Sequence, residues 1–106
     1  MTIIGILFLM KNIMTGFYLP AIDYIYCTDQ ATCNHEIAHR MDTTGGNISE
    51  SPEYQSALEN FILQQNDETW SGWFSNNSWR EKYAQFYERA GGEISNMPPE
   101  LIRFYQ

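Results

Sequence analysis

Residues 28–47, "TDQATCNHEIAHRMDTTGGN", contain the only two histidines of this 106-residue chain and have helix signals at both ends. Thr28 or Asp29 can cap a helix N-terminus with a side-chain oxygen. The glycine pair at 45–46 is typical of a helix stop. The segment therefore predicts a helix that runs to about Asp42.

His35 and His39 lie four residues apart in this predicted helix. Residues at this spacing project side by side, so both imidazoles can give a nitrogen to a single metal ion. Glu36 lies next to the pair, where its carboxylate can reach a water on the metal without being a ligand. Random placement would produce this arrangement in about one sequence in a thousand of this composition. The pattern predicts a zinc site with Glu36 as general base.

The other faces of the same helix carry further expectations. Cys33, Ile37 and Met41 fall opposite the histidines, where we expect them to be buried. Asp42 returns to the histidine side and is predicted to orient an imidazole as a hydrogen-bond acceptor. Cys27 and Cys33 are the only cysteines. We interpret them as small buried hydrophobes in preference to a disulfide or metal ligands.

A catalytic zinc site usually has three protein ligands, and with no third histidine a carboxylate must complete it. Glu59 lies 20 residues past His39, but on a helix that reads as scaffold. Glu81 is the better candidate, because Ala84 on the same side of its helix permits close approach. However, Ser78 and Glu81 also form a capping-box pattern, in which Glu81 would only bond back to the backbone.

The flanking sequence predicts the remaining elements. Apolar residues 2–10, "FYLP" and "AIDYIYC" (residues 21–27) read as short strands. Ser51 starts a helix with a buried stripe of Tyr54, Ala57, Leu58, Phe61 and Ile62. Ser78 caps a helix to Ala90 with an apolar stripe of Trp79, Tyr83, Phe86, Tyr87 and Ala90, and Pro98-Pro99 open a last short helix. We expect a single α+β domain over residues 1–106, with a short twisted sheet beside the histidine helix and two to three further helices.

Composition narrows the classes of partner. The net charge of −7 provides no basic stripe to neutralise phosphates, so nucleic acid is excluded as a partner. The nine apolar residues at 2–10 are about half of what a membrane-spanning helix needs. We expect a soluble monomer that acts on a peptide or protein, with the cytoplasm favoured over secretion.

"HEIAHRMD", followed 42 residues after His39 by "EKYAQFY", resembles the small gluzincins (minigluzincins) and the catalytic domain of anthrax lethal factor. The resemblance implies a zincin-like zinc metalloendopeptidase with His35, His39 and Glu81 as ligands of one zinc ion and Glu36 as catalytic base. It also implies that an extended substrate pairs with the strand at Tyr24, Ile25 and Tyr26. Further candidates for orienting a ligand or stabilising an oxyanion are Asp42, Tyr83, Gln85, Tyr87 and Arg80.

Arg40 departs from the zinc-peptidase pattern, which usually has an uncharged residue at this position. Two alternatives stay open. One is a regulatory peptidase of the ImmA/IrrE type, which also joins HExxH to a later Glu-x-x-Ala motif. The other is a latent or non-catalytic metal-binding interaction module, in which zinc is structural and no ligand position stays open for water.

Overall fold

The computed structural model describes residues 15–65 and 76–106. In this part the elements follow in the order β1 (Gly16–Leu19), η1 (Pro20–Ile22), β2 (Tyr24–Cys27), α2 (Gln30–Thr44), η2 (Ile48–Glu50), α3 (Pro52–Gln65), α5 (Trp79–Arg89), η3 (Ile94–Asn96) and α6 (Pro99–Ile102). The described residues are mostly helical with one antiparallel strand pair, which confirms the α+β class. The strand predicted over residues 2–10 lies outside the described residues.

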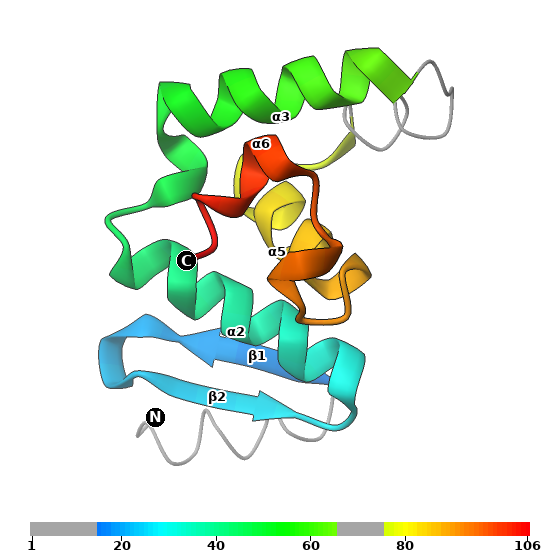
Figure 1. Cartoon of the computed structure of the whole chain (residues 1–106). Helices are drawn as coiled ribbons and strands as arrows, with labels where there is room; N and C mark the ends of the chain where they lie inside the picture. The colour runs from blue at the N-terminus through cyan, green and yellow to red at the C-terminus, as the bar shows by residue number, and fades with distance from the viewer. Residues whose placement is uncertain (1–14, 66–75) are drawn as a thin grey trace.

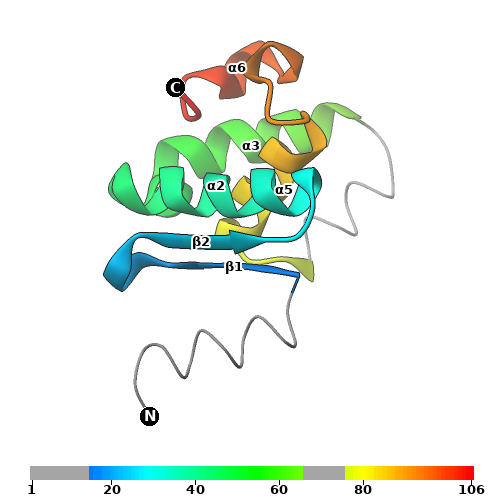
Figure 2. The same ribbon diagram turned by 90° about the horizontal axis from the view of Figure 1, so that it is seen from below.

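β1 and β2 form a hairpin in which Gly16 lies opposite Cys27 and Leu19 opposite Tyr24. Asp23, in the left-handed conformation with φ of 50°, ends the short turn that reverses the chain. The hairpin runs along one side of α2, and α3 lies on the far side of that helix (Figures 1 and 2). The hairpin is therefore held against the helix that carries the histidines.

Helix α2 confirms the prediction and extends two residues beyond Asp42, to Thr44. The Asp29 side chain caps it by accepting a hydrogen bond from the Thr32 amide at 2.7 Å. Gly16 allows β1 to approach the first turn of this helix, since a Cβ at Gly16 would collide with the Thr32 side chain. This close approach brings β1 beside the histidines.

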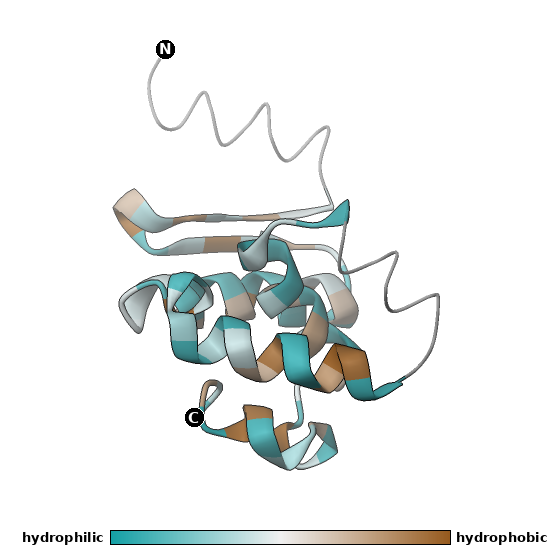
Figure 3. Ribbon diagram, turned by 90° about the horizontal axis from the view of Figure 1, so that it is seen from above, coloured by the Kyte–Doolittle hydropathy of each residue, from teal (hydrophilic) through white to brown (hydrophobic). Residues whose placement is uncertain are grey.

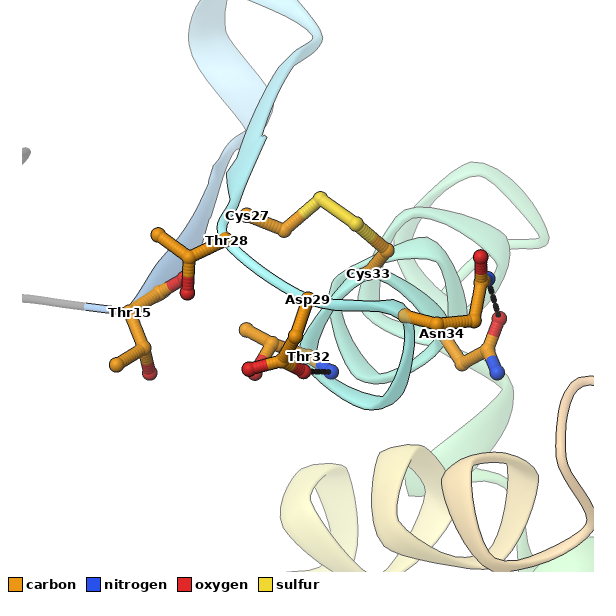
Figure 4. Close-up of a disulfide and its surroundings, with 8 residues drawn as sticks. Thr15, Cys27, Thr28, Asp29, Thr32, Cys33 and Asn34 are labelled. Atoms are coloured by element: carbon orange, nitrogen blue, oxygen red, sulfur yellow. Dashed lines mark hydrogen bonds between the residues drawn. A yellow bond between two sulfur atoms is a disulfide. The ribbon is translucent and has the colours of Figure 1, made fainter.

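Cys27 and Cys33 form a disulfide, so our interpretation of them as two separate buried hydrophobes is wrong. The bond joins the end of β2 to the first turn of α2, across the Asp29 cap (Figure 4). Cys33 lies two residues before His35. The disulfide therefore fixes the junction from which the ligand helix starts.

Removal of this disulfide in a Cys27→Ser/Cys33→Ser variant should lower the free energy of unfolding by about 2 kcal/mol. The estimate follows from the loop-closure entropy of a loop of about seven residues. Urea unfolding of both proteins checks it, with the wild type repeated in a reducing buffer. Reductant should destabilise the wild type by a similar amount and leave the double variant unchanged; equal sensitivity of the two would contradict the assignment.

The core lies between α2, α3, α5 and the C-terminal segment. Both predicted stripes contribute to it, with Tyr54, Leu58 and Tyr83 fully buried. The helices carry hydrophobic and hydrophilic bands rather than uniform surfaces (Figure 3). Three buried tyrosines are joined by hydrogen bonds: the Tyr105 hydroxyl donates to the Tyr83 carbonyl, which leaves Tyr54 as donor to Tyr105.

No helix among the described residues is long and apolar enough to cross a membrane.

The buried face of α2 differs from the predicted one. Asn34, Ala38 and Asp42 are buried, whereas Ile37 is 37% exposed and Cys33 is joined to β2. The reason is that the hairpin and α5 contact α2 on different sides, so the wheel has two contact faces instead of one.

Candidate metal centre

Three of the predicted residues, His35, His39 and Glu81, meet at one point. The imidazoles lie in the middle of α2 with ring centroids 4.9 Å apart. Glu81, in the first turn of α5, places one carboxylate oxygen 3.1 Å from His35 Nε2 and the other 3.0 Å from His39 Nε2. One ligand atom from each residue lies within 4.8 Å of the others. The group can therefore hold a metal ion.

Helix α5 delivers Glu81 because it packs closely on α2. Ala38 and Ala84 are both fully buried, and a Cβ at Gly92 would lie 2.8 Å from the Asn34 side chain. The capping role also proves compatible with the ligand role. Ser78 Oγ accepts a hydrogen bond from the Glu81 amide at 3.3 Å, while the Glu81 carboxylate faces the imidazoles. Ser78 caps the helix, and Glu81 remains available for the site.

Glu59, the other candidate ligand, lies exposed on α3 and is not part of this group. Its charge instead acts on the ammonium group of Lys82, whose pKa is lowered by burial and raised again by Glu59. The spacing from His39 alone could not distinguish the two glutamates, because it does not say which helix packs on α2.

Glu88 is a site residue that the sequence analysis missed. Its Oε1 accepts a hydrogen bond from His35 Nδ1 at 2.9 Å, so the Nε2 atom of that ring points at Glu81. Metal-binding histidines are commonly oriented by such a carboxylate on the second ring nitrogen. Glu88 follows Glu81 by seven residues, two helical turns, and this spacing is a signal that could have identified it.

Asp42 does not orient an imidazole, so that prediction is wrong. It is 1% exposed, and its two carboxylate oxygens accept hydrogen bonds from the Ser49 amide at 2.7 Å and the Ser49 hydroxyl at 2.6 Å. The chain reverses after α2 and returns Ser49 to the end of the helix. Asp42 therefore stabilises the turn from α2 into η2.

Hydrogen bonds set the charge of the cluster. Those from His35 and His39 hold the pKa of the Glu81 carboxyl far below its usual range. The hydrogen bond to Glu81 raises the pKa of His35. The carboxylate is thus ionised at neutral pH, as a metal ligand must be, and a bound ion would replace the proton on Nε2.

Glu36 lies beside the ligand group and is 8% exposed. Burial raises the pKa of its carboxyl, and the nearby imidazoles partly oppose this effect. Glu36 is not a member of the three-residue group that can hold a metal. Glu36 is therefore a buried carboxylate next to a group that can hold a metal ion.

An open hollow of about 620 Å³ adjoins the site. We call it the site hollow, and it is lined by Gly16, Phe17, Tyr18, Pro20, His35, Glu36, His39, Ser78, Arg80 and Glu81. Its strand residues come from β1, whereas the predicted substrate strand, at Tyr24, Ile25 and Tyr26, is β2. The described lining of the site hollow includes three residues of β1 and none of β2, so the predicted substrate strand does not border it.

Of the candidates for oxyanion stabilisation, Arg80 lines the site hollow, whereas the tyrosines and Gln85 lie elsewhere. Tyr83 is fully buried, with its hydroxyl donating to the Phe104 carbonyl at 2.6 Å, so its assignment is wrong. Tyr87 stacks on Tyr105, and Gln85 donates to Asn77 at 3.4 Å; neither lines the site hollow. The polar side chains that do line it include Tyr18 and Arg80.

Arg40 points away from the site. Its Nε and Nη2 atoms donate to the Asp23 carboxylate at 2.7 and 3.1 Å, and this contact lowers the pKa of Asp23. The ion pair ties the hairpin turn to α2 at the surface. The charge at position 40 therefore does not conflict with the ligand pattern.

No family model, curated protein or solved structure matches this chain. What the site can do is consequently argued from its donor set. Two imidazoles and one carboxylate are typical ligands of zinc in hydrolytic sites, where a fourth position is left for water.

Loss of Glu88 should weaken metal binding, measured with zinc, by about tenfold, because carboxylates that orient a metal-binding histidine typically contribute 10- to 100-fold in affinity. Glu88→Ala should show the full loss and Glu88→Gln only part of it, since an amide oxygen still accepts from Nδ1. Competition with a chromophoric chelator measures the affinity, and ¹⁵N spectra of the histidine rings report the tautomer of His35. Glu100→Gln, an exposed change on α6, is the control. Unchanged affinity and tautomer in Glu88→Ala would contradict this role.

Proposed function

We propose that this chain is a zinc-dependent metallopeptidase with a zincin-like fold, built like the small gluzincins. One observation carries the proposal. His35 and His39 come from α2 and Glu81, 42 residues after His39, comes from α5, yet the three meet with nitrogen–oxygen distances of 3.0–3.1 Å beside Glu36 and an open hollow. A chance cluster of surface groups would not also combine the ligands with a buried base.

The donor set fits zinc. His35 and His39 would supply Nε2 atoms and Glu81 one carboxylate oxygen, while Glu88 holds the His35 ring in place. When bound, zinc would supply a Lewis acid that polarises a peptide carbonyl and lowers the pKa of a water toward about 7.

Glu36 performs the proton transfers in this proposal. Its carboxylate takes a proton from the attacking water and returns it to the leaving amine. Burial raises its pKa and so makes it a stronger base than an exposed glutamate. β1 lines the site hollow, so an extended substrate would lie along this strand, with backbone hydrogen bonds that hold its scissile bond beside Glu36.

The experiment combines metal analysis with a cleavage assay. Purified protein should contain about one zinc per chain and should cleave members of a random peptide library, with new termini identified by mass spectrometry. 1,10-Phenanthroline should abolish cleavage, and added zinc should restore it. Protein that binds no zinc refutes the proposal; protein that binds zinc and cleaves nothing favours the metal-binding module instead.

A further inference from the structure

Among the described residues that line the site hollow, Arg80 is the one lysine or arginine. Its Nη2 atom has a contact of 3.5 Å to the Thr43 hydroxyl, at the limit of hydrogen-bond distance. The other arginines lie elsewhere: Arg40 is paired with Asp23, Arg89 lines a separate groove, and Arg103 lies over the Phe104 ring. Arg80 is exposed and lines the same hollow as the three candidate ligands.

Arg80 places one positive side chain in a hollow that is also lined by the Glu36 and Glu81 carboxylates. Arg80 is the second residue of α5, where the helix N-terminus adds partial positive charge. The chain as a whole has a net charge of −7, which repels anions from most of its surface. A guanidinium presents paired N–H donors that match the geometry of a carboxylate.

We infer that Arg80 selects peptides that carry a carboxylate close to the scissile bond. The inference rests on the proposed peptidase function and names the substrate class of that site. The carboxylate belongs either to an Asp or Glu side chain or to the C-terminus of the peptide. These two sources share one recognition chemistry, which the test separates.

A purely structural role for Arg80 would give different results. Its contact with Thr43 joins the start of α5 to the end of α2. If that were its whole function, substitution of Arg80 would lower the stability of the protein and weaken the binding of all peptides equally. Discrimination between charged and neutral peptides is therefore the decisive measurement.

Peptide capture provides this measurement without turnover. Zinc-loaded protein with Glu36→Gln is immobilised and exposed to degenerate hexapeptide pools, with recovered peptides quantified by mass spectrometry. Pools with Glu, Gln or Lys at one fixed position report side-chain selection, and pools with a free acid or an amide end report C-terminal selection. We expect Glu over Gln, or acid over amide, to be enriched about three- to tenfold, as for a partly exposed charge-assisted hydrogen bond.

Variants assign the enrichment to Arg80. In the Glu36→Gln background, Arg80→Gln should remove it, and Arg80→Lys should retain part of it. Arg89→Gln, on the same helix but outside the site hollow, should leave it unchanged. Enrichment should fall at 1 M NaCl because salt screens exposed charges.

Equal recovery of Glu, Gln, acid and amide pools overturns the inference, as does enrichment that survives in Arg80→Gln. Failure of the proposed function would look different. In that case acidic peptides are captured through Arg80, yet protein with an intact Glu36 cleaves none of them. Cleavage by that protein without any acidic preference would instead keep the peptidase and remove the role of Arg80.

Discussion

Glu36→Gln should leave the zinc content unchanged and lower the rate of peptide hydrolysis by about 10²- to 10⁴-fold. The magnitude is that of a lost general base. Glu36 is 8% exposed and lies beside the three-residue ligand group without belonging to it. Glutamine has the same shape and cannot accept the proton, so the change removes chemistry and little packing. Zinc analysis and kcat/KM on a peptide selected from the library check the two halves of the expectation.

Glu53→Gln, an exposed change on α3, is the matched control and should leave both quantities unchanged. Loss of zinc together with activity in Glu36→Gln would mean that Glu36 supports the metal. Full activity in that variant would remove Glu36 from the mechanism and leave a site in which water is activated without this base.

Local signals in the sequence were sufficient to predict the helices and strands that carry the site. The Asp29 cap and the glycine stop bound α2, and the i, i+4 spacing places His35 and His39 side by side whatever surrounds the helix. The hairpin strands and the buried stripes of α3 and α5 follow from the same kind of periodic pattern. These features depend on neighbours in sequence, which is why they could be predicted.

The errors arose in the choice of the partner that a side chain contacts. Asp42 bonds to Ser49 because the chain reverses after α2, and a helical wheel contains no such information. Cys27 and Cys33 are brought together by the turn from β2 into α2, within a separation of six residues. The hydrogen bond from the Tyr83 hydroxyl to the Phe104 carbonyl and the pairing of Arg40 with Asp23 likewise depend on tertiary packing. In each case the residue was noticed but its partner could not be chosen.

Glu81 was identified as a candidate from the sequence, but its position beside the histidines depends on the packing of α5 on α2. Its substitution should have a large effect on zinc binding. Glu81→Ala should weaken zinc binding by at least about 100-fold, more than loss of a residue that only orients a ligand usually does, because a direct ligand is lost. One carboxylate oxygen of Glu81 lies beside His35 and the other beside His39. No other described acidic residue of α5 takes its place at His39. Chelator competition measures the affinity, and Glu59→Ala on α3 should bind zinc like the wild type.

Folding must be separated from binding in this comparison. The Ser78 cap uses the backbone amide of residue 81, which alanine retains, so α5 should keep its N-terminus. Glu81→Ala should therefore unfold in urea close to the wild type when both are free of zinc, and differ from it when zinc is added. Zinc stabilises only the protein that binds it, by an amount set by the ratio of zinc concentration to Kd. If Glu59→Ala lost the zinc-dependent stabilisation and Glu81→Ala kept it, the ligand would be on α3, and the contacts between α5 and the histidines would be hydrogen bonds alone.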